Sequence, residues 1–284
     1  MIKGIIIDVD GVIVGEKIGY NSPNPNSDVS SALKSIREKG IIVSLCTAKP
    51  HYSVQKIIND AKLHNLHITN GGGVIIDTID NVVLKKHLIN EADATSLIRE
   101  LISADVFTEF YSVEEYYLQK SQKSDLSDTH TFILQREPQF VESVVEESKR
   151  RAIVKIMPVA NDEKDKERII KIFEPFKDKL SLSWGIHPIA LPHVFGIITA
   201  KGISKQQACK EIMSYSHISQ EEMLGIGDST SDWQFMELCG YVGAMGNASE
   251  ELKKKVEERG VNGFVGKSVD ENGILDILRH FNVV

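Results

Sequence analysis

The chain has 284 residues, of which 42% are hydrophobic, and its 33 Lys and Arg against 40 Asp and Glu give a formal charge of −7. This length favours two domains with sizeable cores. The acidic balance argues against binding to nucleic acid or to an anionic membrane surface, because no basic excess is available to neutralise phosphates. Three widely separated cysteines, Cys46, Cys209 and Cys239, exclude a disulfide framework and give no sign of a zinc site.

The first residues do not resemble a targeting signal. The apolar start is interrupted by Asp8 and Asp10 before the apolar core of a signal peptide can form. No stretch approaches the roughly 20 apolar residues that span a bilayer. We therefore expect a soluble, cytoplasmic protein.

The first third of the chain alternates short apolar runs with helical patterns. Strands are predicted at residues 4–7, 41–46 and 66–68, and helices from Ser27 or Asp28 to Gly40 and from Pro50 to about Lys62. A parallel sheet with helices on its faces is the arrangement that this alternation favours. The third strand ends in the turn sequence Asn70-Gly-Gly-Gly73.

The middle of the chain, residues 84–198, has a different pattern. Val106–Leu118 and Thr129–Leu134 are rich in β-branched and aromatic residues and predict a pair of sheet segments. Helical patterns at about 140–151 and 162–176 alternate with strand patterns at 152–157 and 180–184. This segment has no basic excess. It is predicted to be an α+β domain inserted into the first one.

The last third returns to the strand and helix alternation of the first. Helices are predicted at 205–214, 232–239 and 249–259, and strands at 223–227 and 241–245. The predicted fold is therefore α/β: a doubly wound, Rossmann-like parallel-sheet core of residues 1–83 and 199–284, with an α+β cap inserted at 84–198.

Polar residues that carry chemistry follow the predicted core strands. Ligands of open parallel sheets bind outside the carboxyl ends of the strands, and the residues expected there are Asp8, Asp10, Thr47, Lys205, Asp228 and Asp232. Four carboxylates at one sheet edge would repel one another unless a cation lay among them, and oxygen ligands suit Mg²⁺.

This set of groups suits phosphoryl transfer. In such a site Asp8 attacks phosphorus, and Mg²⁺ neutralises charge between the nucleophile and the phosphoryl group. Thr47 and the lysine ammonium hold the other phosphoryl oxygens. Asp10 protonates the leaving oxygen and later activates water.

Four sequence motifs, taken together, resemble those of the haloacid dehalogenase superfamily. In chain order they are Asp8-Val-Asp-Gly-Val12, Thr47, Gly202-Ile-Ser-Lys205 and Gly227-Asp-Ser-Thr-Ser-Asp232. The inserted middle and the phrases Thr69-Asn-Gly-Gly72 and Ala244-Met-Gly-Asn-Ala248 resemble the Cof-type branch, which carries a large cap between the second and third motifs.

This resemblance implies a role for each matching residue. Asp8 is the expected nucleophile and Asp10 the general acid and base, while Thr47 and Lys205 are the expected phosphate binders. The expected magnesium site consists of Asp8, the backbone carbonyl of Asp10, Asp228 and Asp232. Two positions depart from the family pattern, because Val12 replaces a frequent Thr and Ser231 a usual Asn.

Several other residues have two readings. Lys49 and His51 follow Thr47, so they are either substrate contacts or ordinary surface residues. Asn70 and Asn247 stand beside glycines, as substrate contacts or as turn residues. In the cap, Trp184, His187 and His193 are candidates for a loop that reaches the site, with ordinary packing as the alternative, and Lys201 is expected at the surface.

The function expected from these residues is a Mg²⁺-dependent phosphatase acting on a small phosphorylated metabolite, with sugar phosphates as the favoured class. A large cap disfavours phosphoprotein substrates, which would have to pass under it. Three alternatives stay open: a phosphomutase of the same superfamily, a phospho-acceptor signalling protein, and a binding protein without catalysis. The substrate itself and the oligomeric state are not specified by any motif.

Overall fold

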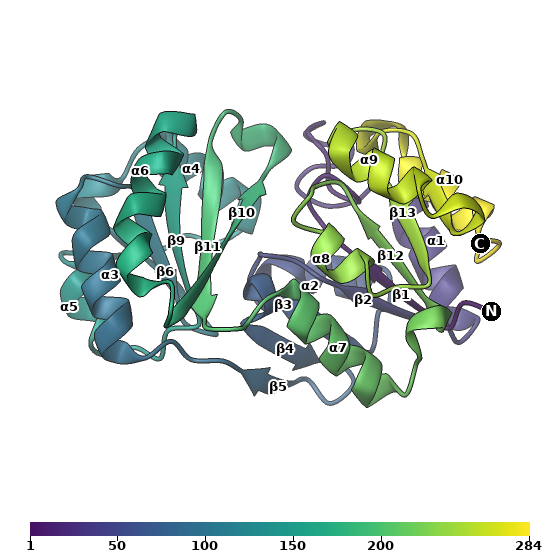
Figure 1. The fold of residues 1–284 in the computed structure, drawn as a ribbon, viewed down its shortest axis with the longest axis horizontal. Coiled ribbons are helices and arrows are strands. Elements are labelled where there is room, and N and C mark those ends of the chain that lie inside the picture. Colours follow the sequence, from purple (N-terminus) through teal and green to yellow (C-terminus); the bar gives the residue numbers. More distant parts are fainter.

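Three sheets organise the chain, and the computed structural model describes all 284 residues (Figure 1). The central sheet of the core has the strand order β14-β13-β12-β1-β2, and all neighbouring strands in it are parallel. Its strands are β1 Gly4–Ile7, β2 Ile42–Leu45, β12 Met223–Gly227, β13 Tyr241–Ala244 and β14 Gly263–Val265. The two ends of the sequence therefore share one sheet.

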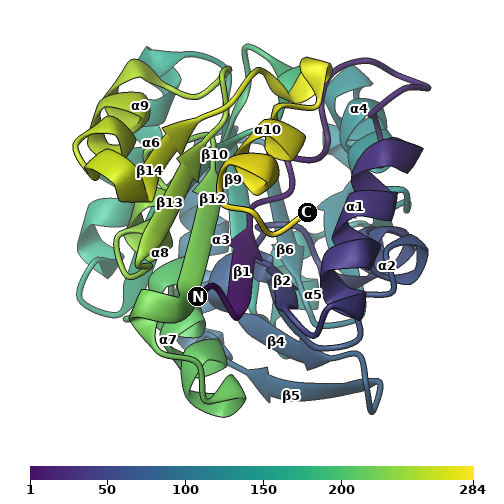
Figure 2. The same ribbon diagram turned by 90° about the vertical axis from the view of Figure 1, so that its right-hand side faces the viewer.

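Helices cover both faces of this sheet, which confirms the doubly wound α/β class (Figure 2). Successive side chains of a strand point to opposite faces, so Ile5 and Ile7 of β1 join one apolar cluster and Ile6 joins another. The first cluster is covered by α1 Ser27–Glu38, α2 His51–Asp60 and α10 Gly273–His280. The second is covered by α7 Lys205–Ser216, α8 Trp233–Met236 and α9 Glu250–Glu257.

The third predicted strand does not extend the parallel sheet. It belongs to an antiparallel sheet of β3 Leu66–Thr69, β4 Val74–Asp77 and β5 Val82–Lys86. The chain reverses after β3 because Asn70, Gly71 and Gly72 all have positive φ angles, which tighten the turn. A single parallel bridge between Cys46 and Ile68 joins β3 to the end of β2.

The middle of the chain forms a second body around a six-stranded sheet, on the left in Figure 1. The strand order is β10-β11-β9-β6-β7-β8, antiparallel except for the last pair. Its strands are β6 Thr108–Tyr111, β7 Tyr116–Gln119, β8 Gln139–Val141, β9 Lys155–Ala160, β10 Leu180–Ile186 and β11 Val194–Ala200. The outer face is covered by α3 Glu91–Ser103, α5 Val144–Ser148 and α6 Glu163–Phe173.

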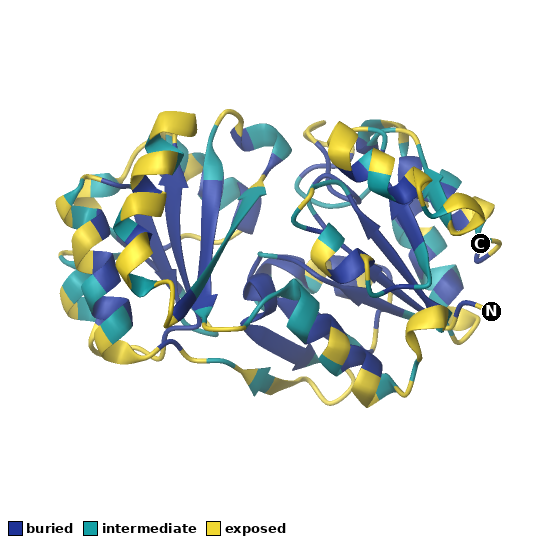
Figure 3. Cartoon of the chain, in the orientation of Figure 1, coloured by how far each residue is buried: buried dark blue, intermediate teal, exposed yellow.

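The inner face of this second sheet is turned towards the core. Tyr111 and Phe195 on that face belong to the same apolar cluster as α2 of the core. The helix α4 (Asp125–Leu134) contributes Ile133 and Leu134 to it. The parallel core sheet and the six-stranded sheet are largely buried, while the helices outside them expose one side (Figure 3). The apolar packing is therefore continuous between the two bodies.

For the middle segment, one prediction is wrong and another holds only in part. Thr129–Leu134 is the second half of α4 and not a strand, because Ser124 and Ser127 form a capping box that starts a helix there. The helix predicted at 140–151 is replaced by β8 and by the short helix α5. In both cases local propensity is overridden by capping and by tertiary packing.

The expected limits of the inserted segment fall inside strands. The 83/84 limit lies within β5, and the 198/199 limit lies within β11, whose last residue Ala200 pairs with Leu180. Of all the helices, none combines the length and the apolar character needed to cross a membrane.

Candidate active site

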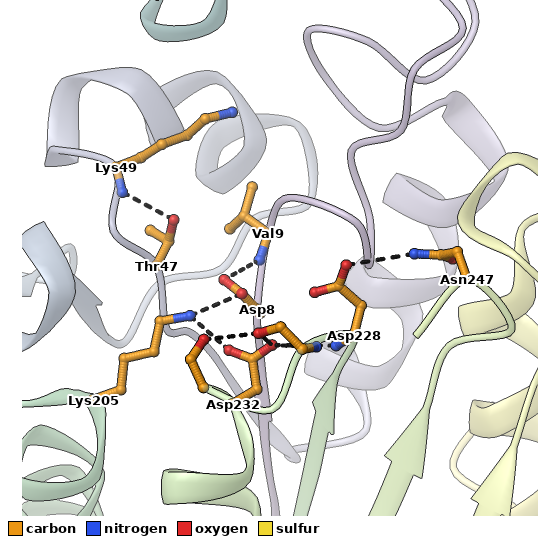
Figure 4. Close-up of polar contacts among 10 residues, drawn as sticks. Asp8, Val9, Thr47, Lys49, Lys205, Asp228, Asp232 and Asn247 are labelled. Atoms are coloured by element: carbon orange, nitrogen blue, oxygen red, sulfur yellow. Dashed lines mark hydrogen bonds and ion pairs between the residues drawn. The ribbon is translucent and has the colours of Figure 1, made fainter. Parts of the chain in front are cut away.

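The central sheet brings the predicted residues together at the carboxyl ends of its strands. Asp8 follows β1, Thr47 follows β2 and Asp228 follows β12, and these three strands are direct neighbours. Lys205 is the first residue of α7 and Asp232 immediately precedes α8. Figure 4 shows their side chains pointing towards one another.

Lys205 joins two of the carboxylates. Its Nζ lies 2.8 Å from Asp8 Oδ2 and 2.8 Å from Asp232 Oδ1. Although burial disfavours the ammonium, Asp232 and Asp8 together raise the pKa of Lys205 well above its ordinary value. The lysine is therefore charged throughout the neutral range. Its helix begins at this point because the Ser204 hydroxyl accepts the Gln207 N–H at 3.2 Å.

Asp232 is the most completely hydrogen-bonded carboxylate of the group. Its Oδ2 accepts the N–H groups of Asp228 at 3.2 Å and Ser229 at 3.1 Å, and the Ser229 hydroxyl at 2.8 Å. Burial acts to raise the pKa of Asp232, but Lys205 and these donors lower it overall. Asp232 therefore fixes both Lys205 and the turn that carries Asp228.

The three carboxylates of Asp8, Asp228 and Asp232 have oxygen atoms that all lie within 4.8 Å of one another. Lys205 alone balances them, and Asp228 has only a long contact of 3.5 Å to Asn247 Nδ2. Burial, followed by repulsion from Asp232, raises the pKa of both Asp8 and Asp228. The donor set fits a hard divalent cation, which would relieve this repulsion.

Two glycines permit the close approaches that build the site. Gly11 has a φ of +79°, and a Cβ there would lie 1.9 Å from Asp228 Oδ2. Gly72 has a φ of +102°, and a Cβ there would lie 2.4 Å from the Ser204 carbonyl oxygen. A side chain at either position would displace a residue of the site. Steric crowding therefore explains why glycine stands at both positions.

Asp10 is not part of the cluster of three carboxylates and has partners of its own. Its Oδ1 lies 2.7 Å from Lys49 Nζ and 3.0 Å from Nε2 of His187, a residue of the second body. Burial would raise the pKa of Asp10, but Lys49 and His187 outweigh it and lower the pKa. His187 Nδ1 accepts the Ile189 N–H at 3.3 Å, so the proton of a neutral ring is on Nε2, towards Asp10.

A cleft of about 580 Å³ lies over these residues, between the core and the inserted segment. Thr47 lines it, and its hydroxyl accepts the Lys49 N–H at 3.0 Å, which leaves the O–H free to donate. Several further hydroxyl groups line the same cleft, from Ser183, Ser229, Thr230, Ser231, Ser249 and Ser268. The lining is thus suited to a polar ligand.

Of the residues that could be either substrate contacts or ordinary structural residues, some contact the site and others do not. Lys49 and His187 belong to the site through Asp10. His51 instead lies 3.5 Å from Glu114, and Trp184 has Lys166 over its ring, so neither lines the cleft. His193 also lies outside the cleft lining, and Lys201 is exposed.

The asparagines and the two departures from the family pattern have local structural explanations. Asn247 donates to the Gly11 carbonyl at 2.9 Å and accepts the Val269 N–H at 2.8 Å. Asn70 is buried in the turn after β3. Val12 lies in the apolar core, and the Ser231 hydroxyl is 2.7 Å from that of Ser229.

Two residues near the site were not singled out by their sequence. The Ser229 hydroxyl donates to Asp232, and the position of Ser229 inside the fourth motif is the feature of the sequence that could have indicated this role. Lys155 of β9 donates to the Ala48 carbonyl at 2.8 Å, from a strand whose pattern showed only apolar residues around it.

The chain matches a known protein family over nearly all of its length. The model of the haloacid dehalogenase-like hydrolase family matches residues 5–278. Phosphatase YwpJ of Bacillus subtilis is 24% identical, over 98% of this chain and 99% of its own. The 5-amino-6-(5-phospho-D-ribitylamino)uracil phosphatase YwtE of the same organism is also 24% identical, over 96% and 95%.

Solved structures share the fold over the whole chain. A haloacid dehalogenase-like hydrolase from Bacteroides thetaiotaomicron superposes with a TM-score of 0.81 at 18% identity, covering 99% of this chain and all of the other. The subclass IIB sugar phosphatase BT4131 superposes with a TM-score of 0.79 at 21% identity, over 99% and 100%. The two relatives from Bacillus subtilis described above are phosphatases by name. With its family match from residue 5 to 278, the chain belongs to the haloacid dehalogenase-like hydrolases, in their Cof-type branch.

Proposed function

We propose that the protein is a Mg²⁺-dependent phosphatase that hydrolyses a small phosphorylated metabolite through an aspartyl-phosphate on Asp8. The observation that carries the proposal is the position of the Asp8 carboxylate, 2.8 Å from the Lys205 ammonium and inside the carboxylate cluster. A nucleophile beside one fixed cation and a cation-binding set is what phosphoryl transfer needs.

The proposed reaction has two steps at phosphorus. Asp8 attacks the phosphorus atom, and the bond to the ester oxygen breaks as Asp10 gives that oxygen a proton. Asp10 then takes a proton from water, which attacks the same phosphorus, releases inorganic phosphate and restores the Asp8 carboxylate. Thr47 and Lys205 hold the remaining phosphoryl oxygens in both steps.

Asp8, the backbone carbonyl of Asp10, Asp228 and Asp232 would hold the metal ion. When bound, Mg²⁺ supplies positive charge opposite the charge that develops on the phosphoryl group. The hydrogen bonds of Asp232 support an orienting role for it, while the long single contact of Asp228 leaves its carboxylate available as a ligand.

We propose that residues 84–198 act as a cap domain on a core of residues 1–83 and 199–284. The cap supplies His187, which lies 3.0 Å from Asp10, so closure completes the surroundings of the acid and base. A closed cap also excludes bulk water while the ester bond breaks. Cap opening is then needed for substrate entry and product release.

Phosphate release from a panel of phosphorylated metabolites, with and without Mg²⁺, tests the proposal. We expect release that depends on the metal and that Asp8→Asn abolishes. The panel includes sugar phosphates, phosphorylated hydroxy acids and nucleoside monophosphates, and their rank order identifies the substrate class. Lys201→Met, at an exposed position, is the matched control variant.

Two outcomes contradict the proposal. Release at the same rate from Asp8→Asn would remove Asp8 as the nucleophile. Transfer of the phosphoryl group to a second sugar position without free phosphate would identify a mutase instead. Both are visible when the products are separated by chromatography.

A further inference from the structure

A second cavity of about 60 Å³ lies beside Asp10 and extends into the inserted segment. We call it the side chamber, and Lys49, Lys155, His130 and His187 are its basic lining residues. Five residues line both the side chamber and the main cleft, namely Asp10, Ala48, Gly185, Ile186 and Ile197. The chamber is therefore an extension of the proposed active site.

Basic side chains outnumber acidic ones in the lining of the side chamber. The four basic residues are each at most 5% exposed, and Asp10 is the only carboxylate among the lining residues. The buried Glu109 of β6 is not part of the lining. It already accepts the Tyr111 hydroxyl and lies 3.0 Å from His130 Nδ1.

Lys155 is the clearest sign of this imbalance. Its Nζ donates to the Ala48 carbonyl at 2.8 Å and lies 3.6 Å from the centre of the Tyr111 ring, and no carboxylate forms an ion pair with it. An ammonium has three N–H donors, so some of them remain free. Burial lowers the pKa of Lys155 to about 7 because nearby negative charge does not compensate it.

The chamber lies where the leaving group begins. A general acid must be within hydrogen-bond reach of the oxygen that it protonates, so the ester oxygen lies next to Asp10. Lys49 Nζ is only 2.7 Å from the Asp10 carboxylate. An anionic group attached to the first carbon of the leaving group can therefore reach Lys49, and Lys155 lines the same chamber. The chamber is small and lined by buried basic residues, so it suits a small anionic group such as a carboxylate.

We propose that the side chamber is a subsite for a carboxylate of the leaving group, held by Lys49 and Lys155. This inference rests on the proposed phosphatase function and narrows its substrate class to the phosphate esters of small hydroxycarboxylic acids. The carboxylate provides an anionic partner for Lys155, whose contacts within the protein are a carbonyl oxygen and an aromatic ring. Charge-assisted hydrogen bonds in a buried site give both affinity and selection against uncharged analogues.

A matched pair of esters tests the subsite. The probes are 2-phosphoglycolate and its uncharged analogue 2-hydroxyethyl phosphate, compared by kcat/KM with Mg²⁺ present. We expect the native protein to prefer the carboxylate ester by about 10-fold or more. Lys155→Met, which keeps the length and removes the charge, should bring this ratio close to one. Lys171→Met on the exposed side of α6 is the control and should retain the ratio.

The possible results separate the subsite from the phosphatase proposal. Equal hydrolysis of the two esters by the native protein overturns the subsite and leaves the phosphatase proposal standing. A preference that survives in Lys155→Met also overturns it, because the carboxylate then binds elsewhere. Hydrolysis of neither ester, nor of any other panel member, overturns both proposals. If the Met variant does not fold, Lys155→Gln keeps a donor for the Ala48 carbonyl and gives the same readout.

Discussion

The two sides of the site differ in the ionisable groups that they carry. On the core wall, the carboxylates of Asp8, Asp228 and Asp232 gather around one lysine, so acidic groups are in excess there. On the cap wall, Lys155, His130 and His187 line the side chamber, and Glu109, the carboxylate beside His130, is not part of that lining. We expect the core wall to hold a metal ion and the reacting phosphoryl group, and the cap wall to select the rest of the molecule.

The two walls also differ in how their residues are held. Asp232 is fixed by three donors from its own turn besides Lys205, so the core wall is organised locally. The contacts of Lys155 with Ala48 and of His187 with Asp10 instead cross from one body to the other. The core wall is therefore expected to persist when the cap opens, while the cap wall is complete only in the closed arrangement.

The largest expected effect comes from the core wall. Asp8→Asn should lower kcat by at least about a thousandfold, because it removes the attacking oxygen and its charge. Phosphate release measures the loss, and circular dichroism shows whether the fold is kept. A folded variant with nearly normal turnover would assign the nucleophile to another residue.

Removal of divalent metal tests the excess of acidic groups on the core wall directly. Treatment with a chelator should abolish phosphate release, and added Mg²⁺ should restore it. Asp228→Asn should raise the Mg²⁺ concentration needed for half-maximal activity by about 10-fold or more, since this carboxylate has no strong partner within the protein. Full activity in chelator would show that Lys205 alone balances the core wall.

The acid and base role of Asp10 can be separated from its charge. Asp10→Asn should lower kcat for an alkyl phosphate by about 100- to 10,000-fold, the usual range for general acid–base catalysis. The rate of the first step is measured as the burst of leaving-group release. For p-nitrophenyl phosphate, Asp10→Asn should lower this rate less, because nitrophenolate leaves without protonation. Equal losses in that burst for both esters would contradict protonation by Asp10.

His187 tests whether the cap wall takes part in the reaction. His187→Ala should lower kcat for alkyl phosphates by roughly 10-fold, since Asp10 loses one of its two partners. His187→Gln, which retains an N–H donor, should recover part of the loss. An equal effect of both variants on KM alone would indicate a role in substrate contact rather than in the positioning of Asp10.

The last prediction concerns stability and not turnover. Lys155 keeps its proton up to pH 10.5 in the unfolded chain but only up to about 7 in the folded one. Between these values the unfolded state binds more protons, so the free energy of unfolding should rise with pH by at most about 1.4 kcal/mol per unit. Lys155→Met should lack this rise. Urea denaturation of both proteins from pH 7 to 10 measures the difference, and parallel curves would contradict the lowered pKa of the buried Lys155.

The sequence was most informative where chemistry and chain order coincide. The strand and helix alternation placed Asp8, Thr47 and Asp228 after neighbouring strands, and the structure brings these side chains together. Only Gly fits at position 11 without displacing Asp228, so the glycine of the first motif also has a steric cause. The core wall consists of short sequence segments, and its residues can therefore be predicted from the sequence.

The cap wall could not be read in the same way. Lys155 stands in an apolar strand whose register across the sheet decides which face it occupies, and the sequence marks His187 only as one of three candidates for a loop that reaches the site. Contacts of this kind depend on the packing of two bodies. The same holds for α4, whose apolar residues Ile133 and Leu134 pack in one cluster with residues of α2.

The close approach of Gly72 to the Ser204 carbonyl links the turn after β3 to the start of α7. It lies where the chain re-enters the core after the second body, one residue before Lys205. Gly72 itself does not line the cleft. A side chain at position 72 is therefore expected to impair the site at a distance, by moving the first turn of the helix that carries the lysine.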